Sequence, residues 1–456
     1  MAPSTRSVKL KRAAKRNLTD LGKRIPWVQR AMRSALKAKR TRSYAQMCAE
    51  VEIDDHTVMF ECYAGRGYTC SPRALYQRML ADPKFEDYTF VWAFRRPVLR
   101  ELNMREGYDV RGLGSTQNVA NPMGIERAFG ADALKELKRA TLVAYSSPEY
   151  YRMHAKARHW ISNYILPTHM LPRDGQVYLQ TWHGTPLKRL GCDIAQDKAN
   201  AMYQVDDIHK RYIDEGKRFT HLISPSPFTT EKLTTAFDIP DHGIDHVIIE
   251  EGYPRNDYLR TVTAEQIAET KRRLRLPEDK TVILYAPTFR DDQHAAGIGY
   301  TLKAQADFDL LQRELGDDHI ILFRPHYLVA NRFRFARFDG FIRDASAIQD
   351  INDLYIVSDM LITDYSSVFF DYANLGRPML FFMYDLERYA EELRGFYLDL
   401  EELPGPIIRT EPELVQAIRA ADSSSEPTAD CMQMFSQRFN GMDDGNAAQR
   451  VLDRLF

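Results

Sequence analysis

Short apolar runs and amphipathic stretches alternate along most of the chain, and their order predicts its fold. Apolar runs rich in Val, Ile, Leu, Phe and Tyr are typical of strands that are buried on both faces. In the first half of the chain, strands are predicted at Val58–Tyr63, Tyr88–Ala93, Thr141–Tyr145, His159–Ser162, Val177–Thr181, His221–Ser224 and His246–Glu250. Helices are predicted between them at Pro72–Ala81, Ala131–Arg139 and Tyr150–Ala157.

A turn-rich stretch at 252–257 ends this series, and a second alternating series follows. Its predicted strands are Thr281–Ala286, His319–Phe323, Met360–Thr363 and Pro378–Phe382. Its predicted helices are Ala264–Leu274, Phe308–Leu315, Ile348–Val357, Ser366–Leu375 and Pro412–Ala421. Strands that alternate with helices form parallel sheets with right-handed crossovers. We therefore predict an α/β fold with two doubly wound, Rossmann-like domains, 46–257 and 258–456, that face a cleft. The pattern leaves open whether the last helix, Asn446–Phe456, returns to the first domain.

The first 45 residues form an arm of different character. Residues 1–42 contain fourteen Lys and Arg but a single acid, Asp20, which leaves 48 basic and 62 acidic residues in the rest of the chain. Steps of four and three separate the apolar residues of the arm, which are Leu10, Ala14, Leu18, Leu21, Ile25, Val28, Met32 and Leu36. This spacing predicts an amphipathic helix, with Trp27 beside its apolar face and a break or kink at Pro26.

Three environments suit such a basic arm. Lys and Arg bind phosphates of any origin, so nucleic acid is one alternative, and a solvated tail without a partner is another. The apolar face favours the third, the surface of an anionic membrane, because tails that bind nucleic acid do not need such a face. We therefore expect residues 1–42 to bind an anionic membrane surface, and we expect no nucleic acid partner.

The composition excludes several protein classes. With 44% hydrophobic and 27% charged residues among 456, the chain has the make-up of a soluble globular protein. No stretch approaches the ~18 apolar residues of a membrane span, and the amino terminus lacks the apolar core of a signal peptide. The five cysteines are widely spaced and form no CxxC pair, which argues against a disulfide framework or a zinc site. These features predict a cytosolic protein, and together with the basic arm they predict a peripheral protein on the cytoplasmic face of the membrane.

The most informative segment for chemistry is 181–188, Thr-Trp-His-Gly-Thr-Pro-Leu-Lys. Its histidine, His183, follows a predicted strand, and open α/β sheets bind ligands at the carboxyl ends of their strands. An imidazole titrates near neutral pH, so His183 can accept a proton from an attacking hydroxyl. Taken alone, such a histidine more often caps a turn.

Three loops of the second domain carry a matching set of polar residues. These are Arg290, Arg324, His326, Asp364, Ser366 and Ser367. Each loop follows a predicted strand, so the three converge on one rim of the sheet. Arg290 offers a planar pair of donors to phosphate oxygens, and Ser366 and Ser367 offer hydroxyls and backbone N–H groups where a helix begins. His326 can donate to the same anion or protonate a leaving oxygen.

Each of these residues also has a plain structural explanation. Asp364 and Ser366 suit the N-cap of a helix, and Arg290 or Arg324 could pair with a neighbouring acid or a helix end. Three polar loops on one rim, opposite the His183 loop, nevertheless favour a binding site. Asp291 and Asp292 are the nearest candidates for a divalent ion. The arginine, histidine and helix-end donors can carry the developing charge instead, so we expect no essential metal and no cofactor.

Taken together, these motifs resemble the CDP-glycerol glycerophosphotransferase family, the teichoic acid polymerases and primases of bacterial walls. The resemblance extends from about residue 58 to residue 420. It rests on segments 181–188, 252–257, 285–290, 324–326 and 363–367, supported by 376–378 and the Phe370-Asp371 pair.

The resemblance implies a GT-B fold, with the nucleotide on the carboxyl-terminal domain and the acceptor entering from the other. It also implies a membrane-associated enzyme that moves a polyol phosphate, with glycerol phosphate favoured, from a CDP-activated donor to a hydroxyl of a lipid-linked or growing chain, releasing CMP. On the family pattern, His183 is the expected base and His326 contacts the diphosphate. The other predicted substrate-binding residues are Gly184, Thr185, Lys188, Arg290, Arg324, Asp364, Ser366 and Ser367.

Two alternative functions fit the same residues. A GT-B glycosyltransferase that uses a nucleotide sugar needs a similar base and diphosphate site, and fold reasoning cannot separate the two. A non-catalytic adaptor would bind a membrane or nucleic acid through the arm and would leave the polar rim without a role. The sequence also leaves open whether the polyol is glycerol or ribitol, and whether one unit or many are added.

Overall fold

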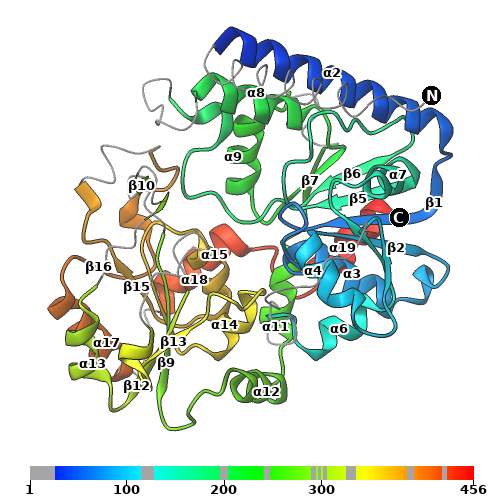
Figure 1. Cartoon of the computed structure of the whole chain (residues 1–456). Coiled ribbons are helices and arrows are strands. Elements are labelled where there is room, and N and C mark those ends of the chain that lie inside the picture. The colour runs from blue at the N-terminus through cyan, green and yellow to red at the C-terminus, as the bar shows by residue number, and fades with distance from the viewer. Residues whose placement is uncertain are drawn as a thin grey trace, which may run out of the picture.

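Two parallel β-sheets with helices packed against them form the body of the protein (Figure 1). The computed structural model describes residues 26–113, 128–195, 204–240, 247–288, 294–295, 299–300, 306–324, 335–387, 395–423 and 429–456. Within these ranges, every strand pair of the two large sheets is parallel. The predicted α/β fold with two doubly wound sheets is therefore confirmed.

The first sheet has the strand order β3-β4-β2-β1-β5-β6-β7-β8. Its strands are β1 (Asp54–Glu61), β2 (Thr89–Phe94), β3 (Asp109–Arg111), β4 (Thr141–Ala144), β5 (Ala157–Ser162), β6 (Val177–Gln180), β7 (His221–Ser224) and β8 (Ile248–Glu250). Its helices include α3 (Cys70–Ala81), α4 (Arg96–Asn103), α6 (Ala131–Leu137), α7 (Pro148–Lys156), α8 (Val205–Gly216) and α9 (Pro227–Phe237). The strand order reverses between β1 and β5, and ligands of such sheets bind outside the strand ends at this point.

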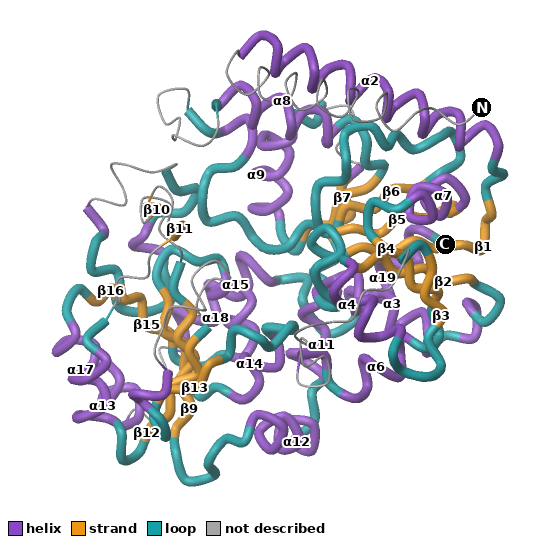
Figure 2. Tube along the Cα trace, viewed as in Figure 1, coloured by secondary structure: helices purple, strands orange, loops and turns teal. Residues whose placement is uncertain are grey.

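The second sheet has the order β13-β12-β9-β14-β15-β16. Its strands are β9 (Thr281–Ala286), β12 (His319–Phe323), β13 (Ile342–Asp344), β14 (Met360–Thr363), β15 (Met379–Phe382) and β16 (Ile407–Ile408). Its helices include α12 (Ala264–Leu274), α13 (Phe308–Leu315), α14 (Asn352–Val357), α15 (Val368–Tyr372) and α17 (Glu411–Ser423). Here the order reverses between β9 and β14. Figure 2 shows the loops at the strand ends of both sheets.

Alternating side chains of the central strands fill two layers of core. Along β12 every residue is buried. Ile320 and Leu322 pack into the cluster on one face of the sheet, while Ile321 and Phe323 pack into the cluster on the other. Successive side chains of a strand point to opposite faces, so a strand covered on both sides must be apolar throughout. This pattern explains why β7, β9, β12 and β14 have the bounds that the sequence predicts.

Three short strands of the two large sheets were not predicted. β3, β13 and β16 contain two or three residues each and lie at the edges of their sheets. Their residues are mostly exposed or half-buried, and a run this short gives no recognisable alternation. The predicted helix at 366–375 is also different, because it divides into α15 and a 3₁₀ turn at Ala373–Leu375.

The last helix, α19 (Ala447–Leu455), packs on the first sheet (Figure 1). The chain leaves the second sheet through α18 (Ala429–Asn440), and α19 then lies against α3. Val451 and Leu452 are buried in the core of the first sheet. The ring of Phe456 lies 3.9 Å from that of His159, with Phe85 and Tyr88 also in contact. The chain therefore crosses between the sheets twice.

Helix α2 (Pro26–Glu50) lies across the outside of the first domain, near α8 (Figure 1). It begins at Pro26, which is the position where the missing N–H of proline removes no helical bond. Its carboxyl-terminal half is anchored by the buried side chains of Tyr44 and Cys48, whereas Leu36 is 52% exposed. Residues 1–25 of the predicted arm lie outside the described residues. No helix in the described part of the chain is long and apolar enough to cross a membrane.

Candidate active site

His183 lies in the loop after β6, at the carboxyl edge of the first sheet as predicted. Its imidazole is half-buried between two aromatic rings. The ring of Trp182 stacks on it at a centroid distance of 4.4 Å, and the ring of Tyr63, from the loop after β1, lies 5.9 Å away. The two loops meet near the point where the strand order of the sheet reverses.

The surroundings of His183 keep its imidazole neutral. Burial and the neighbouring cation of Arg255 disfavour the imidazolium form, and together they lower the pKa of His183 to about 4. A neutral imidazole has a free lone pair at physiological pH and can accept a proton. The imidazole of the substrate-free protein is therefore in the form that a base requires, and the role of base that the sequence predicts for His183 stays a prediction.

The His183 loop also touches the second domain. A Cβ atom added to Gly184 would lie 3.3 Å from the hydroxyl oxygen of Ser367 and 3.6 Å from a guanidinium nitrogen of Arg255. A side chain here would crowd the Ser367 hydroxyl, and the backbone of Gly184, with φ = 156°, also favours glycine. Farther along the loop, the N–H of Tyr397 donates to the carbonyl of Leu187 at 2.8 Å.

The other predicted residues of this loop are partly engaged in structure. Lys188 is half-buried and its backbone forms a β-bridge with Phe396. Thr185 is buried, and its hydroxyl accepts a long hydrogen bond from Thr229. These contacts link the loop to both domains and make its path well defined.

On the second domain, Asp364 holds the ends of two strands together. Its Oδ1 accepts hydrogen bonds from the N–H groups of Thr288, after β9, and of Tyr365, after β14, at 2.7 and 2.6 Å. Asp364 is 2% exposed. These bonds lie where the strand order of the second sheet reverses. Asp364 therefore shapes the predicted rim.

The hydroxyls of Ser366 and Ser367 are half-buried on this rim. Ser367 precedes α15, but its side chain makes no capping hydrogen bond to that helix. The N-cap residue of α15 is thus Ser367, rather than Asp364 or Ser366 as the sequence suggested. Its hydroxyl instead faces Gly184 of the first domain.

The described structure does not bring Arg324 to this contact. Nη1 of Arg324 donates to the backbone carbonyls of Ala345, Ser346 and Ile348. These bonds favour a structural role in holding the loop after β13. Arg290 and His326 lie outside the described residues, so their predicted roles, and the facing of His326 toward His183, stay predictions.

A buried ion pair behind His183 was not predicted. Nη2 of Arg255 donates to both carboxylate oxygens of Asp371 at 2.7 and 2.8 Å, and both side chains are more than nine-tenths buried. Nη1 of Arg255 lies 3.5 Å from the Cys70 sulfur, which joins the pair to α3. Arg255 belongs to segment 252–257. The only sign of its role in the sequence was its position, next to a proline in a turn at the predicted domain boundary.

Asp443 adds to this buried polar group. It lies between α18 and α19, where the chain returns from the second sheet to the first. Its carboxylate accepts hydrogen bonds from the Tyr253 N–H at 2.8 Å and from the amide of Asn256 at 2.6 Å. Burial raises the pKa of Asp443 to about 7. The residues that connect the two domains are thus tied together by buried polar contacts.

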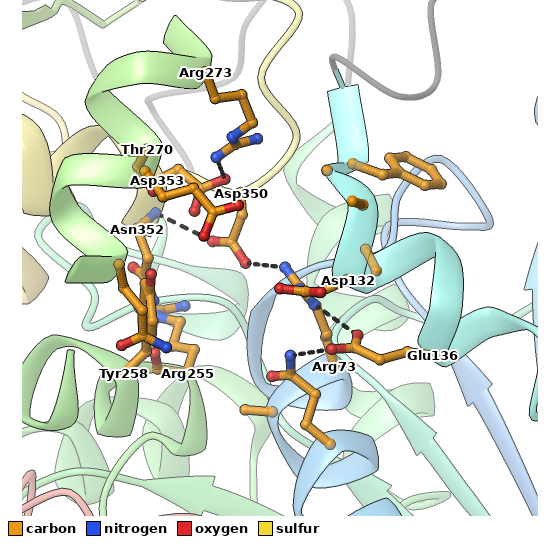
Figure 3. Close-up of a pocket in the computed structure, with 18 of the residues that line it drawn as sticks. Arg73, Asp132, Glu136, Arg255, Tyr258, Thr270, Arg273, Asp350, Asn352 and Asp353 are labelled. Carbon is orange, nitrogen blue, oxygen red and sulfur yellow. Dashed lines mark hydrogen bonds and ion pairs between the residues drawn. The ribbon is translucent and has the colours of Figure 1, made fainter. Parts of the chain in front are cut away.

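A charged cavity of about 320 Å³ lies between the domains and shares Arg255 as part of its wall (Figure 3). Arg73 of α3 reaches across it to Asp350 at 3.3 Å and also approaches Glu136 of α6 at 3.5 Å. On the opposite wall, Arg273 of α12 pairs with Asp353 at 2.6 Å. Ion pairs within and between the domains therefore line this cavity with both signs of charge.

No group of three or more His, Cys, Asp or Glu side chains suited to hold a metal occurs among the described residues. The adjacent acids Asp291 and Asp292 lie outside them. Whether the reaction needs a metal therefore stays a prediction.

Comparison with known proteins identifies relatives along nearly the whole chain. The family model described as CDP-glycerol:poly(glycerophosphate) glycerophosphotransferase matches residues 43–456. The teichoic acid glycerol-phosphate transferase of Staphylococcus aureus (strain NCTC 8325 / PS 47) is 35% identical, over 88% of this chain and 92% of that protein. The teichoic acid poly(glycerol phosphate) polymerase of Bacillus subtilis (strain 168) is 36% identical over 93% of this chain. The chain spans only about half of that polymerase, 52% of its length.

The fold has a close counterpart among solved structures. A structure of the wall teichoic acid polymerase TagF superposes with a TM-score of 0.75 and 32% sequence identity, and the match covers 98% of this chain and 97% of the other. The two parallel sheets are thus the two Rossmann-like halves of a GT-B-like protein, as expected.

Proposed function

We propose that this chain, which belongs to the CDP-glycerol:poly(glycerophosphate) glycerophosphotransferase family, transfers a polyol phosphate from a CDP-activated donor to a hydroxyl of a lipid-linked or growing teichoic-acid-type chain. Glycerol phosphate is the favoured unit, because the family description and several relatives name it. The observation that carries the proposal is the contact between the His183 loop and Ser367, which puts a neutral imidazole at the junction of the two domains.

In the proposed reaction, the acceptor oxygen attacks the phosphorus that bears the glycerol. A new phosphorus–oxygen bond forms as the bond from that phosphorus to the bridging oxygen breaks, and CMP leaves with the bridging oxygen and its negative charge. His183 takes the proton of the acceptor hydroxyl. Donors aimed at the diphosphate stabilise the developing charge.

The diphosphate donors that we propose are Ser366, Ser367, Arg290 and His326. Asp364 and Arg324 act indirectly in this proposal, because their hydrogen bonds shape the loops of the rim. Gly184 provides the close approach of the two domains, and Thr185 and Lys188 fix the path of the His183 loop.

Product analysis tests the function directly. The purified full chain is incubated with a lipid-linked acceptor and one donor at a time, chosen from CDP-glycerol, CDP-ribitol, a UDP-sugar and a GDP-sugar. We expect CMP release with CDP-glycerol and an acceptor that gains glycerol phosphate units by mass. The number of units added distinguishes a primase from a polymerase.

Release of UDP or GDP together with a glycosylated acceptor would replace the proposal with a glycosyltransferase. If the protein turned over none of these donors, the non-catalytic adaptor would be the remaining function. We also propose that no metal is needed, because hydroxyl and cationic donors can carry the charge. Turnover should therefore persist in EDTA, and its loss with recovery on adding Mg²⁺ would overturn that part.

We further propose that the basic arm and α2 hold the enzyme on the cytoplasmic face of an anionic membrane, near its lipid-linked acceptor. Helix α2 lies on the outside of the first domain and presents exposed cations next to the exposed Leu36. Cations near an anionic surface contribute about 1 kcal/mol each, and apolar side chains add to this.

Co-sedimentation with lipid vesicles tests the membrane proposal. Three exposed cations of α2 are changed to Gln, namely Lys39, Arg40 and Arg42. At about 1 kcal/mol each, we expect binding to vesicles rich in phosphatidylglycerol to weaken roughly 100-fold. A matched triple of exposed cations elsewhere serves as the control, namely Arg272, Arg275 and Arg313. Equal binding by both triples, or a preference of the unchanged chain for duplex DNA over vesicles, would contradict membrane attachment through α2.

A further inference from the structure

The two rings that flank His183 share an unusual backbone conformation. Tyr63 has φ = 47° and Trp182 has φ = 48°, so both lie in the left-handed region. Bulky residues rarely occupy this region, because the side chain approaches the backbone closely there. Such conformations persist where the surrounding structure determines them, and they cluster at functional sites.

A buried side-chain amide holds each of these backbones. The N–H of Tyr63 donates to Oδ1 of Asn163 at 2.8 Å, and the N–H of Trp182 donates to Oε1 of Gln180 at 3.0 Å. Both amides are fully buried, with 0% exposure. Asn163 directly follows β5 and Gln180 ends β6, which lie side by side in the sheet next to β1. The same device therefore occurs twice, on neighbouring strands.

The orientation of the Gln180 amide is fixed from its other side. Its NH₂ group donates to the phenol oxygen of Tyr178 at 3.0 Å, and that phenol donates to Glu215 at 2.6 Å. With the NH₂ group directed at these acceptors, Oε1 is the atom left to accept from Trp182. On its outer side, the Trp182 ring packs edge-on against Phe237 at 5.2 Å.

We propose that Asn163 and Gln180 are positioning residues for His183. Each amide fixes the backbone of one flanking aromatic residue, and the two rings then hold the plane and depth of the imidazole, next to the point where Gly184 approaches Ser367. The catalytic part of this inference rests on the proposed function, whereas the positioning part concerns the protein without substrate.

The chain provides a matched control for a purely structural effect. Gln176 directly precedes β6, at the end opposite to Gln180, and is 5% exposed. Its amide donates to the carbonyls of His154 and Ala157 at 2.8 and 2.7 Å. Replacing Gln176 by Leu therefore removes a buried amide just before the same strand without changing the residues around His183.

The test compares Gln180→Leu and Asn163→Leu with Gln176→Leu, using the full chain. The pKa of His183 is measured by NMR on the substrate-free protein with ¹³C-labelled histidine, and the His183 signal is assigned by its loss in His183→Ala. Within the described residues, the Tyr63 phenol and the Arg255 guanidinium act on the imidazole, and Arg255 in turn contacts the Cys70 thiol and the Asp371 carboxylate. None of them is replaced, so a change in the pKa reports the position of the ring.

We expect Gln180→Leu and Asn163→Leu to raise the pKa of His183 by about one pH unit or more, because a loosened ring reaches water. We expect kcat with CDP-glycerol to fall on the order of tenfold or more while KM changes little, since small displacements of a reacting group are costly. Gln176→Leu should lower the melting temperature but leave both quantities unchanged. Asn163→Asp keeps an oxygen acceptor for the Tyr63 N–H and should restore the kcat that Asn163→Leu lowers. Its added carboxyl raises the pKa of His183 by itself, so only kcat is compared for this variant.

An unchanged His183 pKa in both Gln180→Leu and Asn163→Leu would overturn the proposal, as would equal effects in Gln176→Leu. If one of the two Leu variants fails to fold, the other variant still tests the proposal. The comparison of Asn163→Asp with Asn163→Leu provides a further test. Failure of the unchanged chain to turn over CDP-glycerol would refute the proposed function, while the NMR titration would still report on positioning.

Discussion

Replacing His183 by Ala should lower kcat for CMP release from CDP-glycerol by on the order of 100- to 10,000-fold, which is the usual contribution of a positioned general base. Binding of CDP-glycerol should change little, because the proposed diphosphate donors remain. Calorimetric titration of the donor separates binding from turnover. Exposed His56, at the opposite end of β1, provides the control, and His56→Ala should retain full activity.

The pH dependence adds a second check on the same residue. The neutral imidazole is the active form, so kcat/KM should fall only as the pH drops through the pKa of about 4 in the free protein. The negative charge of a bound diphosphate favours the imidazolium, so the acidic limb of kcat should lie at higher pH than that of kcat/KM. An acid limb of kcat/KM near 6.5 would indicate a water-exposed imidazole, and full activity of His183→Ala would exclude it as the base.

Removal of one partner from the buried Arg255–Asp371 pair should destabilise the protein strongly. Asp371→Leu leaves the Arg255 guanidinium buried without its counterion, and such a loss costs about 3–5 kcal/mol in the free energy of unfolding. A typical domain has only about 5–15 kcal/mol in total, so the melting temperature should fall sharply. Chemical denaturation followed by tryptophan fluorescence measures the loss.

The double variant Arg255→Met, Asp371→Leu distinguishes an unpaired charge from lost packing. With both charges removed, much of the stability should return, because buried ion pairs often contribute little beyond an apolar pair of similar volume. Removing the Arg255 cation should also raise the pKa of His183, since that cation helps to lower it. If the double variant is as unstable as the sum of the single variants, the pair is not coupled as the geometry indicates.

The fold could be predicted because buried strands have a direct signature in the sequence. β9 and β12 are apolar throughout and packed on both faces, so their bounds follow from the residues alone. The position of His183 could be predicted as well, because it follows such a strand. The edge strands β3 and β16 could not, since their few residues owe their conformation to the neighbouring strand.

The surroundings of His183 could not be predicted, because they come from segments far apart in the chain. Asn163, Gln180 and Tyr63 are ordinary polar and aromatic residues in the sequence, and only the sheet order brings their strand ends together. The pairing of Arg255 with Asp371 spans 116 positions. Arg324 shows the opposite case. The sequence suggested that it binds the diphosphate, but its guanidinium donates hydrogen bonds to backbone carbonyls.

The return of α19 to the first sheet has a consequence for biosynthesis. Ala448, Val451 and Leu452 belong to the same core as residues of β1 and β2, although nearly 400 positions of chain separate β1 from them. The ribosome makes β1 early and α19 late. Part of the apolar surface of the amino-terminal half therefore stays uncovered until the second half of the chain has been translated. A nascent chain of this kind is a natural client for chaperones, and stalled translation products should be prone to aggregate.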